Sequence, residues 1–292
     1  MKVAVIIPTF NRRELLSNLL NILVRQTTTP LTIIVVDASS SDGTKDMLST
    51  SFKEVTHLIC SEDLWWTESI NVGLKYVRNN FPSLNGVVLL NDDVIIGADW
   101  LRRLLDVADN NKKSLVGCVA VDFLNPNKIL YAGKHVNTWL GSVKHPYYGE
   151  KLSNYDSNKI VKSFDLLGRG IYIPMNVFKE IGLYDEISFK HRGDTELPLR
   201  ARVQKGYNLI VSFSPIVKIM PNQTAQIDIK NRLTLKEVFS RMNDFRGSFY
   251  WKYTFYYIKI YSTTIFQQYF VFLLRMIRIF FGGLVRTIIS RK

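Results

Sequence analysis

The chain has 292 residues, of which 47% are hydrophobic, so it can form one large domain with an appendage. Its formal net charge is +13, and residues 231–292 alone hold eleven Lys/Arg against two Asp/Glu, which indicates an anionic surface as partner. The only cysteines, Cys60 and Cys118, lie in apolar runs, which excludes a disulfide framework and a cysteine zinc site and favours a reducing compartment.

The first 121 residues alternate between short apolar runs and segments with helical spacing. The apolar runs predict buried strands at 2–7, 31–36, 55–60, 86–90 and 114–121. The helical spacing predicts helices at 14–26, 44–50, 68–79 and 99–110. This alternation predicts an α/β fold, with a mostly parallel sheet sandwiched by helices. The first run is too short for the apolar region of a signal peptide, and we expect none.

The chain is less regular after residue 121. Residues 126–157 have no clear period, which predicts hairpins and a long loop, a common place for substrate binding. Strands at 161–167 and 171–174, joined by a tight turn, a helix at 176–181, a helix opened by 194–196 and a strand at 209–213 complete the expected domain.

Two adjacent acids follow the predicted strand 86–90. Asn91, Asp92 and Asp93 therefore lie at the carboxyl end of a buried strand, where open α/β sheets bind ligands. Adjacent carboxylates repel each other in a dry site unless a cation lies nearby, which favours a divalent metal that holds a diphosphate. A solvated strand-to-helix turn is the alternative, and this stretch alone does not decide between the two. The chain has no G-x-G-x-x-G after its first strand and no P-loop motif.

The last segment, 249–286, is dense in aromatic and aliphatic residues. Its longest stretch without charge, 260–274, has 15 residues, whereas a membrane-spanning helix needs about 20, so we expect no conventional span. On a helix, one mostly polar and basic stripe would contain Thr264, Gln268, Val271, Arg275, Arg278, Gly282 and Arg286. The broad apolar remainder predicts a helix that lies in an anionic membrane surface. Docking on the domain or in a homodimer is the alternative.

Seven motifs in the same order resemble the family 2 glycosyltransferases, of the kind that build bacterial capsule, O-antigen and wall polysaccharides. They are 5–12, 35–37 with 41–44, 71–74, 89–93, 168–170, 182–186 and 193–200. The resemblance implies a GT-A domain over 1–230, followed by a basic, aromatic-rich helical tail over 231–292 that associates with membrane.

The resemblance also implies roles for particular residues. The expected donor-binding residues are Pro8, Thr9, Asn11, Arg12, Asp37, Ser39, Trp66, Asn71, Asp92 and Arg169. Asp37 matches the acid that accepts from a pyrimidine N–H, and Asp93 matches the carboxylate that binds Mg²⁺ or Mn²⁺. Asp194 matches the general base, although an acid there also suits a helix cap. Trp66 suits a wall of the sugar pocket or simple packing equally well.

The implied function is inverting transfer of one sugar from a UDP- or dTDP-sugar, for example rhamnose or a galactose form, to a lipid-linked glycan. The transfer would take place at the cytoplasmic face of the membrane, with the protein bound there as a peripheral membrane protein. Gly193 and Ile70 depart from the family pattern, and 216–225 lacks the usual metal-binding histidine. Metal dependence is therefore open, and Lys218 is a candidate cationic substitute. The missing histidine and Ile70 also motivate an alternative, a catalytically inactive binding subunit. The sequence carries no nucleic-acid recognition motif, and the glycine-free first turn disfavours a nucleotidyltransferase.

Overall fold

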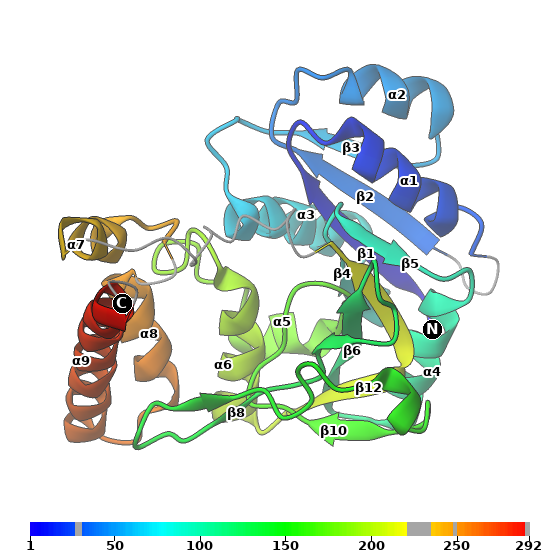
Figure 1. The fold of residues 1–292 in the computed structure, drawn as a ribbon. Helices are drawn as coiled ribbons and strands as arrows, with labels where there is room; N and C mark the ends of the chain where they lie inside the picture. Colours follow the sequence, from blue (N-terminus) through cyan, green and yellow to red (C-terminus); the bar gives the residue numbers. More distant parts are fainter. Residues whose placement is uncertain (27–30, 221–234, 248–249, 290–292) are drawn as a thin grey trace.

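The computed structural model describes residues 1–26, 31–220, 235–247 and 250–289. One mixed sheet organises the first 220 residues (Figure 1). Its strands are β1 (Val3–Thr9), β2 (Leu31–Asp37), β3 (Thr56–Ile59), β4 (Gly86–Leu89), β5 (Val94–Ile96), β6 (Ser114–Asp122), β7 (Ile129–Tyr131), β10 (Ile160–Lys162), β11 (Ile171–Pro174) and β12 (Asn208–Ile219). The main order is β10-β12-β6-β11-β4-β1-β2-β3, with β5 paired to β12 and β7 to β6.

The strands β1, β2, β3 and β4 are parallel to one another, and β6 is parallel to β12. Between these two groups, β11 runs antiparallel to both β4 and β6. The flanking helices are α1 (Arg13–Leu23), α2 (Thr44–Ser51), α3 (Trp66–Asn80), α4 (Trp100–Asn110), α5 (Met175–Ile181) and α6 (Glu196–Lys205). The α3 helix packs on β1 and β2, and α4 packs on β6 and β12. The predicted α/β sandwich is therefore confirmed.

Two strands differ from the prediction. The expected hairpin of 161–167 with 171–174 does not form, because β10 ends at Lys162 and pairs with β12, whereas β11 enters the middle of the sheet. The chain leaves the sheet after β10 so that Phe164 can pack on the C-terminal helices and the buried Asp165 can pair with Lys134. A short strand that was not predicted, β5, follows the acidic pair directly and joins β12.

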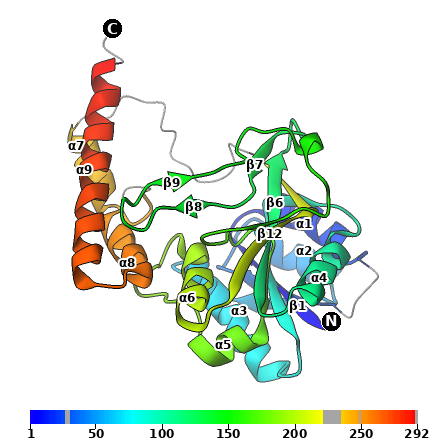
Figure 2. The same cartoon turned by 90° about the horizontal axis from the view of Figure 1, so that it is seen from below.

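The irregular region 126–157 forms hairpins, as expected. After β7, the strands β8 (His135–Val136) and β9 (Val143–Lys144) pair antiparallel and run out from the sheet toward the C-terminal helices (Figure 2). These helices are α7 (Leu235–Asn243), α8 (Trp251–Tyr261) and α9 (Ile265–Ile289). A second hydrophobic cluster joins them to the first domain through Phe164, Leu199, Ile258, Tyr261 and Val271. The predicted boundary at 230/231 lies outside the described residues.

One side of α9 contacts the domain and the other side is exposed. Val271 is fully buried, and the guanidinium groups of Arg275 and Arg278 donate to the carbonyl oxygens of Gly141 (3.0 Å) and Leu140 (2.6 Å) at the tip of the β8–β9 hairpin. Val271, Arg275 and Arg278 of the stripe therefore contact the domain. The side left exposed is apolar, and we call it the apolar face of α9: Ile265, Phe266, Tyr269, Phe270, Leu273 and Ile277. No helix in the described ranges is long and apolar enough to cross a bilayer.

Candidate active site

The carboxyl ends of β1 and β4 bring an arginine, a threonine and the acidic pair together. The hydroxyl of Thr9 donates to Oδ2 of Asp92 (2.8 Å), and Nη1 of Arg12 donates to Oδ1 of the same carboxylate (3.0 Å). Burial raises the pKa of Asp92 to about 6, against the opposing effects of Arg12 and of the Thr9 hydrogen bond, while the charge of Asp93 adds to the rise. Because the pKa is raised, ionising Asp92 costs folding free energy at neutral pH, and this cost is relieved as the pH falls below about 6.

Asp93 has room for a cation. Its Oδ2 lies 3.5 Å from Nη1 of Arg12, but its Oδ1 is buried and has no hydrogen-bond partner. A buried carboxylate oxygen without a partner is costly, and a divalent metal would satisfy it. Among the described residues no group of three His, Cys, Asp or Glu side chains could hold a metal by itself. Asp93 therefore fits a metal that takes its other ligands from phosphate and water, as Mg²⁺ sites do.

The loops after β1 and β2 are tied to each other. The backbone N–H of Asn11 donates to Oγ of Ser40 (2.8 Å), and Oδ1 of Asn11 accepts from the N–H of Ser41 (2.8 Å). Asn11 and Ser39 both have positive φ, 51° and 58°, which fixes two tight turns beside Pro8. These bonds shape the edge where the donor-binding residues were predicted.

Asp37 and Ser39 are engaged by protein groups. Oδ1 of Asp37 accepts from the N–H of Ser40 (2.9 Å), its Oδ2 lies 3.1 Å from Nε2 of His57, and the side chain is almost fully buried. The hydroxyl of Ser39 donates to the carbonyl of Cys60 (2.5 Å). A nucleobase that bonds to Asp37 would therefore have to share this carboxylate with Ser40 and His57.

Asn71 has a structural role in place of the predicted donor contact. Its amide donates to the carbonyl of Tyr184 (2.9 Å) and to Glu186 (2.6 Å), and its carbonyl accepts from the N–H of Tyr184 (3.1 Å). The side chain is 2% exposed, so it joins α3 to the 184–186 loop from inside. The neighbouring Ile70 is fully buried in the core.

A cavity of about 580 Å³ opens beside these elements. Its lining comes from the end of β4, from β6, β7 and β12, from the hairpin region, from the two loops around residues 168 and 193, and from α8. The lining residues are Trp66, Asn91, Gly117, Cys118, Ala120, Leu130, Tyr131, Lys134, His145, Tyr148, Leu167, Arg169, His191, Arg192, Asp194, Thr195, Ile219 and Tyr253. Asp194 and the residue next to the acidic pair, Asn91, thus share one cavity. The exposed side chain of Lys218 is not part of the lining.

Trp66 connects the two sides of this cavity. Its indole Nε1 donates to Oδ1 of Asn91 (3.0 Å), which fixes the ring against the β4 end. The other end of the ring lies against Gly168, where an added Cβ would come within 2.4 Å of Cζ2. The N–H of Gly168 in turn donates to Oδ2 of Asp194 (3.3 Å). Trp66 is therefore both a wall of the cavity and a packed residue.

Asp194 is not the cap of its own helix. No side-chain cap bond is present at the start of α6, and the bond from Gly168 is the only hydrogen bond of this carboxylate within the described structure. The residue before Asp194 is a glycine, and a larger residue would not fit there, because a Cβ at Gly193 would lie 2.3 Å from Oγ1 of the buried Thr67. Glu196, the secondary candidate, is buried, pairs with Arg200 and accepts from the N–H of Asp185. Asp194 is therefore the carboxylate that faces the cavity.

Several lining residues were not predicted. Tyr253 reaches the cavity from α8, and its hydroxyl lies 3.1 Å from Oγ1 of Thr195. Lys134 pairs with the buried Asp165, whose carboxylate also accepts from the hydroxyl of Tyr257. Sequence spacing gave no signal for these contacts, because they join segments about 30 to 90 residues apart.

The aromatic residues of the irregular region have three different places. Tyr148 lines the cavity. Tyr147 instead packs edge-on against Tyr155 and Phe213. Trp139 lies half-exposed at the hairpin tip and does not line the cavity.

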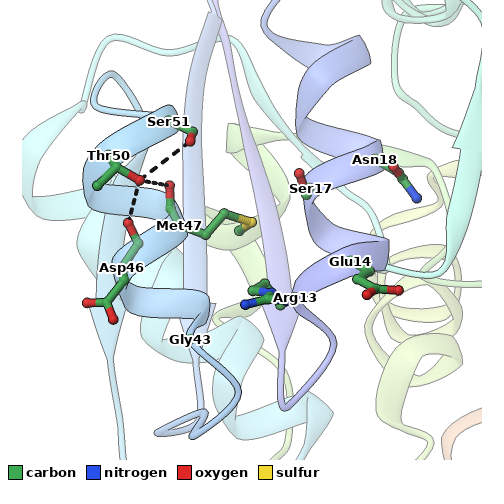
Figure 3. A pocket seen from close by; sticks show the side chains of 9 residues that line it. All are labelled: Arg13, Glu14, Ser17, Asn18, Gly43, Asp46, Met47, Thr50 and Ser51. Atoms are coloured by element: carbon green, nitrogen blue, oxygen red, sulfur yellow. Dashed lines mark hydrogen bonds between the residues drawn. The ribbon is translucent and has the colours of Figure 1, made fainter.

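A second cavity, of about 520 Å³, lies between α1 and α2 (Figure 3). Its lining is polar, and Oγ1 of Thr50 lies there with bonds to the carbonyls of Asp46 (2.7 Å) and Met47 (3.3 Å). It contains none of the predicted site residues, and we assign it no role in binding.

The close contact at Gly168 gives a first prediction. We expect Gly168→Ala to lower the free energy of unfolding by about 1–3 kcal/mol, because the new methyl group would overlap Trp66. Denaturant unfolding measures this change. Gly97→Ala is the matched control, since the nearest atom, Oδ1 of Asp99, would lie 3.8 Å away, and it should change stability by less than about 0.5 kcal/mol. Equal effects at both positions would contradict the packing described here.

Comparison with known proteins gives one family and several similar folds. The model of the family described as Glycosyl transferase family 2 matches residues 4–165. The dTDP-rhamnosyl transferase RfbF of Shigella flexneri is 24% identical over 189 residues, which are 64% of this chain. The chain spans 58% of the length of that relative.

Two solved structures resemble the chain. Mannosyltransferase PcManGT from Pyrobaculum calidifontis, in complex with GDP-Man and Mn²⁺, has a TM-score of 0.59 at 14% identity, with 98% of this chain and 72% of that chain covered. S. aureus TarS 1–349, in complex with UDP, has a TM-score of 0.52 at 16% identity, with 75% and 60% covered. At such low identity, these likenesses show the fold alone.

Proposed function

The chain belongs to glycosyl transferase family 2, and from this premise we propose that it transfers one sugar from a nucleotide-diphosphate sugar to a hydroxyl group of a lipid-linked glycan, with inversion at the anomeric carbon. It is a glycosyltransferase with the GT-A fold. A dTDP-sugar or a UDP-sugar is the proposed donor, in view of the rhamnosyltransferase relative and the UDP-bound neighbour. Bacterial surface polysaccharide, such as capsule or O-antigen, is the proposed product.

The observation that carries this proposal is the carboxylate of Asp194, which faces the cavity with one protein hydrogen bond and free acceptor capacity. As the acceptor oxygen forms its bond to the anomeric carbon, Asp194 takes the hydroxyl proton. The bond from the anomeric carbon to the diphosphate oxygen breaks, and the diphosphate leaves with the electron pair. Attack from the face opposite the leaving group inverts the configuration.

Ile70, which motivated an inactive binding subunit together with the missing histidine, and Gly193 both have structural explanations. Gly193 replaces the usual glutamate because Thr67 occupies the space that a side chain would need. Ile70 fills the core, where an arginine would be buried without a partner. Neither change removes a group from the cavity, so both are compatible with an active enzyme.

A divalent metal fits the acidic pair. Asp93 would hold Mg²⁺ or Mn²⁺ through its free Oδ1, together with diphosphate oxygens. A bound metal would supply Lewis-acid stabilisation of the leaving diphosphate. Arg12 would remain beside Asp92 and offset part of the charge of the two acids.

The proposed donor gives a thermal-shift prediction. We expect saturating dTDP or UDP with Mn²⁺ to stabilise the protein by about 2.7 kcal/mol when the nucleotide is at 100 times its Kd. A chelator should remove most of this gain, because the diphosphate would lose its bridge to Asp93. If neither nucleotide stabilises the protein with or without Mn²⁺, the proposed donor class is wrong. Stabilisation that a chelator leaves unchanged would contradict the proposed metal site at Asp93.

We further propose that the chain acts peripherally at the cytoplasmic face of the membrane, where a lipid-linked acceptor is anchored. The support is the apolar face of α9, with Ile265 75% and Phe266 70% exposed over a 25-residue helix. Exposed lysines on the neighbouring α8, Lys252 and Lys259, would face an anionic headgroup layer. The apolar face, rather than the basic stripe, is the proposed contact with lipid.

This proposal predicts loss of vesicle binding on charge insertion. The double variant Phe266→Asp, Leu273→Asp should lower partitioning into phosphatidylglycerol vesicles at least about tenfold, because each buried apolar side chain contributes about 1.5–3 kcal/mol. Co-sedimentation with vesicles measures it. Leu124→Asp is the control, an 86% exposed leucine outside α9, and should bind as the unaltered chain does. Wild-type binding by the double variant would exclude this face as the membrane contact.

A further inference from the structure

Two arginines line the cavity without protein partners. Among the residues that the structure describes, the guanidinium groups of Arg169 and Arg192 have no hydrogen bond and no ion pair, although both side chains are partly buried. A partly buried cation without a partner loses hydration and gains little in return. Planar guanidinium groups bind phosphate by two parallel hydrogen bonds, so such a pair is suited to a phosphate group.

The backbone at Arg192 supports a binding role. Its φ is +63°, in the left-handed region that residues with a side chain rarely adopt. Such conformations cluster at ligand sites, where the surrounding structure holds them. Only Gly193 separates Arg192 from Asp194, so the guanidinium belongs to the same loop as the proposed base.

The other titratable groups of the cavity do not cancel this positive charge. Burial lowers the pKa of His191 to about 4 and also lowers the pKa of His145, so both rings are neutral at pH 7. Lys134 pairs with Asp165. Among the described residues that line the cavity, Asp194 is the one carboxylate, against two unpaired guanidinium groups.

The cavity lies on the acceptor side of the proposed reaction. Its lining contains no residue from β1, from β2 or from the loops that follow them, where the nucleotide is proposed to bind. Instead it contains Lys134, His145 and Tyr148 from the hairpin region, and Tyr253 from α8, whose neighbour α9 carries the proposed membrane contact. A ligand here approaches Asp194 from the side of the tail.

We propose that Arg169 and Arg192 bind a phosphate group of the acceptor, which gives Arg169 an acceptor contact in place of the donor contact that the family resemblance implied. This inference rests on the proposed function and deepens it: the acceptor is a short glycan on a lipid phosphate or diphosphate. A reaction that joins the first sugar to the lipid through this phosphate or diphosphate must then supply it.

The test is calorimetric titration of the full chain with inorganic phosphate and pyrophosphate, with and without saturating dTDP or UDP. We expect both anions to bind the nucleotide-loaded protein as tightly as the free protein. Arg169→Gln and Arg192→Gln should each weaken anion binding at least about tenfold, with nucleotide affinity unchanged. Arg78→Gln, on α3 and outside the cavity, is the matched control and should bind as the unaltered chain does.

Two results would overturn the inference. If dTDP or UDP displaces phosphate competitively, the two arginines serve the donor diphosphate. If both glutamine variants bind phosphate normally, the arginines are not the site. Arg192→Lys keeps the positive charge but loses the planar pair of N–H donors, so it should also bind phosphate more weakly. It tests the site independently if the Arg192→Gln protein folds poorly. Absence of nucleotide binding in the presence of normal phosphate binding would count against the proposed donor, and not against this site.

Discussion

Asp194→Asn is expected to lower kcat for sugar transfer by about 10²- to 10⁴-fold and to leave nucleotide affinity unchanged. The amide keeps the shape of the side chain and can still accept from the N–H of Gly168, but it cannot take a proton from an acceptor hydroxyl. Nucleotide binding depends on the opposite edge of the site, so it should be retained. Release of nucleoside diphosphate in the presence of acceptor measures the rate.

Asp156→Asn is the matched control for this prediction. Its carboxylate also accepts one backbone N–H, from Asn158 at 2.7 Å, but it lies in an exposed loop outside the cavity. This variant should transfer sugar at the unaltered rate. A folded Asp194→Asn protein with normal turnover would reject the base assignment.

Asp93→Asn should lower kcat/KM by at least about 10²-fold and abolish the stimulation by Mn²⁺. The reason is the buried Oδ1, which has no protein partner and is the carboxylate oxygen available to a metal. The amide retains the size of the side chain, while Asp92 keeps its bonds to Thr9 and Arg12, so the fold should be preserved. Initial rates over a series of Mn²⁺ concentrations measure the change.

Asp99→Asn provides the comparison, because Asp99 is a half-buried acid that pairs with Arg102 and Arg103 on α4 and does not line the cavity. Its metal dependence should equal that of the unaltered chain. Unchanged metal stimulation in Asp93→Asn would mean that the metal, if used, binds elsewhere.

The sheet was predictable from sequence because burial on both faces leaves an unbroken apolar run. The strands β1, β2, β4 and β6 all have this pattern, and the acids appear where β4 ends. Asp92 and Asp93 follow β4 in the chain, so they lie at its carboxyl end, which is the edge where such sheets bind ligands. No further information was needed for this prediction. The strand β11 forms at the predicted residues, but its pairing with β4 and β6 was not predicted, because its four residues carry no signal of the strands beside which they lie.

The remainder of the site depends on contacts that sequence spacing does not encode. Asn71 looks like a ligand contact in the motif, yet its partners are Tyr184 and Glu186, more than 110 residues away. The stripe on α9 had the expected period, but the period does not say what it faces. Carbonyl groups at the tip of the β8–β9 hairpin accept from Arg275 and Arg278 and so turn the apolar side outward.

The most direct test of the account is a crystal structure of the chain with dTDP or UDP and Mn²⁺. The predicted result is Mn²⁺ on Oδ1 of Asp93, with the diphosphate bound beside the acidic pair at the edge of the cavity that Trp66 and Asp194 line. Nucleotide and metal bound instead in the cavity between α1 and α2, or a diphosphate that points away from Asp194, would contradict it.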